Sequence, residues 1–232
     1  MKILLLSDIH GNFEALQAVM QKATRLEYDR IVCLGDLVGY GPQPVEVVSY
    51  IREHDIPCVL GNHDAGVAGL ISLEFFRDPN RSLLKKTQEL LDAENLEWLA
   101  GLPKTIHGDN WVAAHATPLQ TQNWPYLDNS RACQEVLAHI KEELCFVGHT
   151  HRSGIVADRI GVFRVTKGNR YVINPGSVGQ SREKDKRASF AIVDTENVTC
   201  SILKTEFDRS IIMDLLGNMG FNSAEAKRLQ VM

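Results

Sequence analysis

The sequence predicts an α/β fold in which two β-sheets pack together, with helices on their outer sides. One observation is that short apolar runs alternate with segments of helical periodicity as far as residue 142. The other is that from residue 144 the pattern changes to short, closely spaced strands, which is typical of antiparallel hairpins. Strand–helix units followed by a strand-rich half are best accommodated by two packed sheets covered by helices.

In the first part of the chain, apolar runs that end in Gly, Asp or His turns predict buried strands. These strands are 2–7, 31–34, 57–60 and 110–114. Apolar residues at helical spacing predict helices over 13–26, 44–53 and 130–142. Pro44 suits the first turn of its helix, where no backbone donor is needed. The region 65–102 is expected to be wholly helical and to form a cap-like insertion near the cleft.

The rest of the chain is expected to add hairpins and a helical tail to the same unit. The predicted strands are 144–147, 154–158, 161–166, 170–173, 188–194 and 197–204. The end of the chain, 207–232, is expected to form one or two C-terminal helices. Because the sequence contains no internal repeat and no low-complexity segment, residues 1–232 are interpreted as a single domain.

The composition argues against several classes of protein. The 232 residues carry a formal net charge of −4, which offers no whole-surface attraction for nucleic acids or anionic membranes. No stretch approaches the roughly 20 apolar residues that a membrane helix needs, and Asp8 cuts short the apolar run at the N-terminus. The five cysteines form no CxxC pair, so we expect reduced thiols in a cytoplasmic protein.

Five short clusters rich in His, Asp and Asn hold most of the functional information. Each follows a short apolar run, as polar side chains at the carboxyl end of a buried strand do. The clusters are Asp8-Ile9-His10, Gly35-Asp36, Asn62-His63-Asp64, His115 and His149-Thr150-His151. In open α/β sheets, ligands bind at the carboxyl ends of the strands, so we expect these five stretches to converge on one point.

The residue types in these clusters are typical metal ligands. Carboxylate, imidazole and amide donors together suit divalent ions such as Mn, Fe, Zn, Ni or Co. His149 and His151, two residues apart on an extended segment, would point to the same side. Any one histidine would be interpreted as structural, but five of the eight histidines follow strands. Asp36 is the natural bridge between two cations about 3.5–4 Å apart, an arrangement that supports in-line displacement at phosphorus.

These clusters resemble the five motifs of the calcineurin-like metallophosphoesterases, in their order and in their placement after strands. The segment Asn174-Pro175-Gly176-Ser177-Val178-Gly179 also resembles one that is common in the bacterial branch of that family. The resemblance implies a four-layer α/β/β/α sandwich of two mixed sheets flanked by helices. It also implies a metal-dependent phosphoric ester hydrolase that acts on phosphomonoesters or phosphodiesters.

The resemblance further implies a role for each motif residue. One metal would be bound by Asp8, His10, Asp36 and His151. The second would be bound by Asp36 as the bridge, with Asn62, His115 and His149. His63 would be the general acid that faces the leaving-group oxygen, and Asp64 would orient its imidazole and raise its basicity.

Several further residues are candidates for contact with a small phosphate-ester substrate. Asn12 is most simply a helix N-cap, although the helix start could also contact phosphate. Tyr40 could line the cleft or pack within its own loop. Arg152, Arg182 and Arg187 could bind phosphate oxygens bidentately, although a charged surface loop is the favoured interpretation for Arg182 and Arg187.

The loop 116–128 is expected to form one wall of the cleft because it starts directly after His115. Trp124 and Tyr126 on this loop could stack a nucleobase, or they could anchor the loop to the helical region. A nucleotide substrate is therefore one possibility. A protein-binding scaffold of the same fold and a protein phosphatase stay open as alternatives, but a complete set of motif residues favours an enzyme. Nothing in the sequence indicates the oligomeric state.

Overall fold

The computed structural model describes residues 1–162 and 164–230. The first of its two mixed sheets has the strand order β2-β1-β8-β9. β1 (Lys2–Leu6) runs parallel to β2 (Arg30–Cys33) and antiparallel to β8 (Ala188–Asp194), and β8 pairs with β9 (Thr199–Thr205). This sheet therefore joins the first strand of the chain to the last two, because β1 lies directly beside β8.

The second sheet has the order β3-β4-β5-β7-β6. Its parallel centre consists of β4 (Trp111–Ala114), β5 (Leu144–Phe146) and β7 (Tyr171–Pro175). The antiparallel edges are β3 (Thr105–His107) and β6 (Ser153–Ala157). The sequence did not predict β3, whereas the other four strands lie close to the expected positions.

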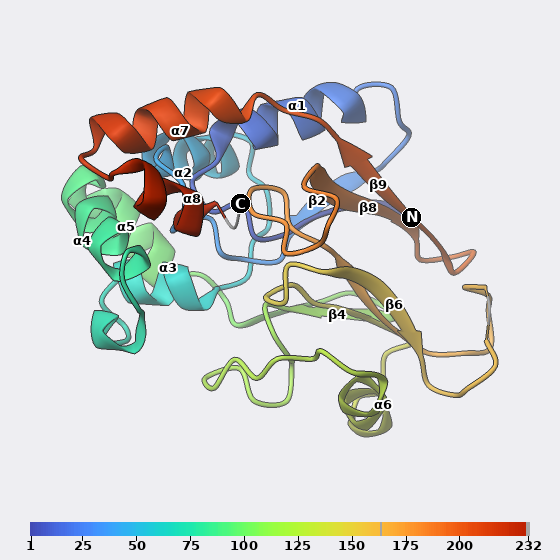
Figure 1. The fold of residues 1–232 in the computed structure, drawn as a ribbon. Coiled ribbons are helices and arrows are strands. Elements are labelled where there is room, and N and C mark those ends of the chain that lie inside the picture. The colour runs from blue at the N-terminus through green and yellow to red at the C-terminus, as the bar shows by residue number, and fades with distance from the viewer. Residues whose placement is uncertain (163, 231–232) are drawn as a thin grey trace.

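Helices cover the outer faces of both sheets, as Figure 1 shows. α1 (Phe13–Ala23) packs against β8 and β9, with α2 (Pro44–Glu53) and α7 (Arg209–Asn218) on the same side. α6 (Ser130–His139) covers β6 and β7 on the opposite side. The layers are therefore helix, sheet, sheet and helix, which confirms the predicted α/β/β/α sandwich.

The core between the sheets follows from the alternation of side chains along each strand. Ile3 and Leu5 face the second sheet, whereas Leu4 and Leu6 face the helices that cover the first. On the second sheet, Trp111 and Phe146 stack with their ring centroids 5.5 Å apart. Because β1 is buried on both faces, its end is a rigid support for the residues that follow it.

The region 65–102 is not wholly helical, so that prediction is wrong. It contains the end of α3 (Asn62–Val67), a short 3₁₀ turn at Leu73–Phe75, α4 (Asn80–Leu90) and α5 (Ala93–Ala100). Gly69, at φ 75°, follows the end of α3, and Asp92 caps a new helix by accepting a hydrogen bond from the Asn95 amide. Turn and cap residues thus interrupt a continuous apolar pattern.

Two other expectations need correction. The predicted strand 57–60 forms only an isolated parallel bridge between Cys58 and Cys33. The predicted strand 161–166 includes residue 163, which lies outside the described residues, and its described neighbours form no strand. The predicted C-terminal helices are α7 and α8 (Ser223–Leu229), and residues 231–232 lie outside the described part of the chain. Within the described ranges, no helix is long and apolar enough to cross a membrane.

Candidate active site

The residues that follow the strands adopt an unusual backbone conformation. Six of them have positive φ angles between 52° and 63°: Asp8, His10, Asp36, Tyr40, His149 and His151. The left-handed region costs a non-glycine residue about 1–2 kcal/mol, and such strain is concentrated at functional sites. The turns therefore stabilise an arrangement of side chains that the isolated segments would not favour.

A first group of buried ligand atoms comes from three of these turns. The Nε2 atoms of His10 and His151 are 3.0 Å apart, and His151 Nε2 lies 3.2 Å from Asp8 Oδ1. His10 Nε2 is 3.6 Å from Asp36 Oδ2. One oxygen or nitrogen from each of these four residues lies within 4.8 Å of the others, which is close enough to surround one cation.

A second group shares Asp36 with the first. His115 Nε2 lies 3.2 Å from Asp36 Oδ2 and 3.1 Å from His149 Nδ1. Asn62, the first residue of α3, lines the same space. The structure thus brings together, around Asp36, the two ligand groups that the family resemblance implies.

Backbone carbonyls hold three of the imidazoles in one orientation. The Nδ1–H groups of His10, His115 and His151 donate hydrogen bonds of 2.7–2.9 Å to the carbonyls of Val38, Leu34 and Gln180, respectively. A carbonyl can only accept, so these contacts place the proton on Nδ1 and leave Nε2 as a metal ligand. Such outer contacts typically fix the tautomer and ring direction of metal-binding histidines.

The donor set fits two divalent cations. Asp36 Oδ2 and Asn62 Oδ1 are buried but form no hydrogen bond among the described residues. Asp36 Oδ2 lies 3.2 Å from His115 Nε2, but the angles of this contact are not those of a hydrogen bond. Leaving a buried acceptor unsatisfied costs about 1–3 kcal/mol. A cation between these oxygens and the neighbouring imidazoles would remove that cost, so the residues match the metals that the motifs imply.

The charges of the cluster also suit metal binding. Burial raises the pKa values of Asp8 and Asp36, but the neighbouring histidines lower these pKa values by a larger amount. Both carboxylates are therefore ionised. Burial and the charge of His115 lower the pKa of His149 to about 3. His115 is the exception, because burial lowers its pKa but the Asp36 carboxylate raises it to about 10. A cation bound there would displace a proton from this ring.

The segment from Asn174 to Gly179 supports the first strand-end turn. Its Ser177 hydroxyl donates a 2.8 Å hydrogen bond to the Asp8 carbonyl, and the Gly179 amide donates one of 3.0 Å to the same oxygen. A Cβ at Gly179 would lie 1.8 Å from the Ile9 carbonyl oxygen, so only glycine fits this close approach. The segment therefore holds the turn that presents Asp8 and His10.

Asp64 does not orient His63, so that expectation is wrong. Its Oδ1 accepts hydrogen bonds from the amides of Leu37 and Val38, and its Oδ2 accepts from those of Asp36 and Gly61. A carboxylate in the first turn of a helix is directed towards nearby N-terminal amides. Burial, together with the Asp36 charge, raises the pKa of Asp64 to about 7. Asp64 therefore positions the turn that presents Asp36.

His63 is held by the packing of its ring. The ring centroid lies 4.7 Å from that of His10, 4.8 Å from Tyr40 and 4.9 Å from Phe76. A Cβ on Gly39 would lie 2.1 Å from His63 Nδ1, so the imidazole occupies the space that a side chain at this position would need. Burial lowers the pKa of His63 to about 4.

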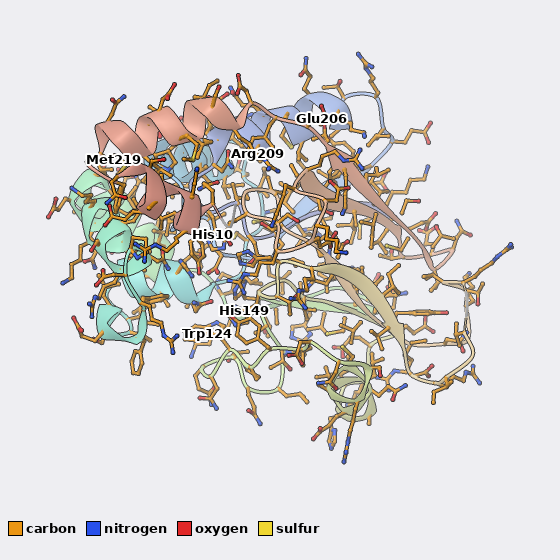
Figure 2. All side chains as sticks on the ribbon, in the orientation of Figure 1. His10, Trp124, His149, Glu206, Arg209 and Met219 are labelled. Carbon is orange, nitrogen blue, oxygen red and sulfur yellow. The ribbon has the colours of Figure 1, made fainter. Side chains whose placement is uncertain are left out.

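A cleft of about 1000 Å³ opens over the cluster. One wall is the loop that contains Trp124 and Tyr126, and the other includes Phe75 and Phe76 of the helical region. The Tyr126 ring stacks on that of His149 with centroids 4.2 Å apart. In Figure 2, His10 and His149 lie between the upper and lower halves of the molecule, with Trp124 beyond His149 on the lower half.

The structure places two of the candidate substrate contacts outside the cleft lining, and it confirms the favoured interpretation of Asn12 as a helix N-cap. Asn12 is the N-cap of α1: its Oδ1 accepts from the Ala15 amide and its Nδ2 donates to the Gly179 carbonyl, so its buried amide is already engaged. Arg152 lines a separate hollow beside α6. Tyr40 lies in the main cleft, with its ring centroid 4.7 Å from that of His10.

For Arg182 the sequence favoured a surface loop over a contact with phosphate, and that preference is wrong. The Arg182 side chain lines the main cleft. Its backbone amide donates a 3.2 Å hydrogen bond to the carbonyl of His151, which connects it directly to a ligand residue. The signals in the sequence were the arginine itself, which can bind phosphate oxygens, and its position three residues after the Asn174–Gly179 segment. Arg187, in contrast, forms an exposed ion pair with Asp185, as expected for a surface loop.

Comparison with known proteins identifies the family. A model described as the calcineurin-like phosphoesterase superfamily domain matches residues 1–198. The chain therefore belongs to the calcineurin-like phosphoesterase superfamily, and it is a phosphoric ester hydrolase.

Three relatives illustrate the range of similarity. The uncharacterized protein MJ0912 of Methanocaldococcus jannaschii is 36% identical over 216 residues, which are 89% of this chain and 88% of that protein. A metallophosphoesterase from Sphaerobacter thermophilus has a crystal structure with a TM-score of 0.85 and 33% identity, covering 99% of this chain and 98% of that one. The symmetrical bis(5′-nucleosyl)-tetraphosphatase of Vibrio campbellii is 30% identical over 150 residues, or 60% of this chain. The match spans about half, 52%, of that enzyme.

Proposed function

We propose that this protein uses two divalent ions, drawn from Mn, Fe, Zn, Ni and Co, to hydrolyse small phosphomonoesters or phosphodiesters, including nucleotides. The observation that carries the proposal is the convergence of two ligand groups on Asp36 at the base of a large cleft. Two ions held in this way would supply an activated water and would neutralise the charge that develops on the phosphoryl oxygens.

The residues of the chain have distinct roles in this proposal. Asp8, His10, Asp36 and His151 would hold one ion, and Asp36, Asn62, His115 and His149 would hold the other. His63 would donate a proton to the departing oxygen, a role supported by its place in the cleft lining beside His10. Because burial lowers the pKa of this ring to about 4, it would take up that proton only in the complex with an anionic substrate. Asp64 is a positioning residue, because its carboxylate binds the amides of the turn that carries Asp36.

Support for nucleotides comes from the cleft and from one group of relatives. Trp124 and Tyr126 offer aromatic rings beside the ligand cluster. Stacking of a nucleobase on such a ring contributes about 1–3 kcal/mol per base to binding. Relatives that match part of this chain are symmetrical bis(5′-nucleosyl)-tetraphosphatases.

The proposal is tested with metal-free protein reconstituted with each ion in turn. We expect hydrolysis of p-nitrophenyl phosphate, bis-p-nitrophenyl phosphate or a nucleotide to depend on the added ion. Asp36→Ala should abolish turnover, whereas Asp185→Ala, which changes a carboxylate outside the cleft lining, should retain it. Metal-independent turnover, or full activity in Asp36→Ala, would refute the proposal.

A further inference from the structure

Arg182 places a positive charge in the cleft without a carboxylate beside it. Its Nη1 donates to the Tyr126 hydroxyl at 3.3 Å, and its Nη2 approaches the Tyr40 hydroxyl at 3.5 Å. Among the described residues, no carboxylate lies within ion-pair distance of Arg182, whereas Arg52, Arg81 and Arg187 each have such a partner. Neutral hydroxyl groups orient the guanidinium but leave its charge available to a ligand.

The two tyrosines connect this guanidinium to both halves of the ligand cluster. Tyr126 stacks on His149 with an interplanar angle of 18°, and Tyr40 packs edge-on against His10 with an angle of 80°. Arg182 itself forms no hydrogen bond to a ligand side chain among the described residues. The guanidinium is therefore held beside the metal centre and outside it, within the same cleft.

The cleft has more positive charge than a single phosphate requires. Apart from the ligand Asp36, its charged lining consists of Arg77, Arg182, Arg228 and Asp78. The carboxylate of Asp78 already pairs with Arg81. The phosphate under attack would be neutralised by the ions, so the arginines are suited to further anionic groups on the same substrate.

We propose that Arg182 binds a second phosphate, adjacent to the one that is attacked, and that the preferred substrates carry two or more linked phosphates. Guanidinium groups match phosphate oxygens with two parallel hydrogen bonds, and the contacts with Tyr40 and Tyr126 set the direction of this one. The inference rests on the proposed function, because it takes the ligand cluster as the place where the first phosphate binds.

The test compares two inhibitors that differ by one phosphate. With p-nitrophenyl phosphate as reporter and free Mn²⁺ held constant, inhibition constants are measured for AMP and for α,β-methylene-ADP. In the wild type we expect the methylene analogue to bind about 10–100-fold more tightly, the range of a charge-assisted hydrogen-bond pair. Arg182→Met should bring this ratio close to one, and Arg182→Lys should restore it in part because it keeps the charge.

Arg187→Met is the matched control, since it removes an arginine five positions along the same segment that lies outside the cleft lining. It should keep the wild-type ratio. A ratio near one in the wild type, or an unchanged ratio in Arg182→Met, would overturn the inference. An equally large loss of kcat/KM for p-nitrophenyl phosphate itself would assign Arg182 to the attacked phosphate instead. If the wild type does not hydrolyse the reporter, the proposed function fails, and calorimetric titration with the same two inhibitors then measures the ratio.

Discussion

Asp36 is the residue on which the two ligand groups depend. Its backbone has a φ of 54°, its amide is bound by Asp64 Oδ2, and its own Oδ1 accepts a 2.9 Å hydrogen bond from the His63 amide. A Cβ at Gly61 would lie 2.1 Å from Asp36 Oδ1, so a glycine is needed for this approach. Oδ1 of this carboxylate is therefore held by the His63 amide, whereas Oδ2 faces the imidazoles of His10 and His115.

Replacement of His63 by alanine tests the general acid. Both metals should be retained, because the ligand atoms come from other residues. The rate with alkyl phosphoesters should fall by about 10²–10⁴-fold, the usual contribution of acid–base catalysis. The loss should be smaller with p-nitrophenyl esters, whose leaving group departs without a proton. Equal losses on both substrates, or the loss of a metal in elemental analysis, would contradict the assignment.

Gly39→Ala should reproduce this pattern without any change at position 63, because the new Cβ occupies the place of His63 Nδ1. Gly69→Ala is the control: Gly69 also has a positive φ, 75°, but a Cβ there meets no atom within 4 Å. Both variants should lose about 1–2 kcal/mol of stability from backbone strain. Only Gly39→Ala should lose more activity on alkyl phosphoesters than on p-nitrophenyl esters. If the two variants have the same rates on both kinds of ester, then His63 tolerates displacement.

At the scale of elements, the cleft lies between an irregular loop and a helical region. The loop 116–128 contains no helix or strand, and Trp124 within it has a φ of 42°. The helical region opposite it places Phe75, which is 80% exposed, and Phe76 at the cleft. An exposed aromatic beside a binding cleft has little stabilising effect on the fold, which favours a role in binding a ligand.

Trp124→Ala distinguishes a stacking role from an anchoring role. If Trp124 stacks a base, kcat/KM for a nucleotide should fall by about 5–150-fold, the equivalent of 1–3 kcal/mol. A small ester such as p-nitrophenyl phosphate should be nearly unaffected. Trp98→Ala removes a tryptophan of α5 that lies outside the cleft lining, and it should not discriminate between substrates. A lower melting temperature, with similar losses of kcat/KM for the nucleotide and the small ester, would contradict the nucleotide interpretation.

For the whole molecule, the candidate metal centre lies where the two sheets meet. Asp8, His10 and Asp36 follow strands of the first sheet, whereas His115, His149 and His151 follow β4 and β5 of the second. Each ion would therefore have ligands from both sheets. Metal binding in this position is coupled to the packing of the sheets against each other.

Removal of the metals should therefore lower the stability of the whole protein. An ion at 100 times its dissociation constant adds about 2.7 kcal/mol to the free energy of unfolding. We expect two metals per chain by elemental analysis and a drop in melting temperature on treatment with a chelator. Asp36→Ala should unfold at a temperature that no longer depends on added metal. Full activity with one metal per chain would contradict the dinuclear model.

The sequence by itself determined the fold class and the candidate metal ligands. Both depend on features that are local in the chain: the apolar runs of four or five residues, and the Asp, Asn and His residues that follow them. An apolar strand is buried almost wherever it packs, and its end then brings the next polar side chain to the edge of the sheet. Asp8, Asp36 and His149 could therefore be proposed as ligands before any contact was known.

The tertiary structure alone decided the contacts between distant segments. Asp64 was expected to orient the imidazole of its neighbour His63. Instead, its carboxylate accepts hydrogen bonds from the amides of Asp36, Leu37 and Val38, which lie 26–28 residues earlier. Arg182 was expected on a surface loop, but it meets Tyr40 across 142 residues of chain. Hydrogen bonds of this kind depend on the direction of each side chain after the layers have packed, and no periodicity in the sequence encodes that direction.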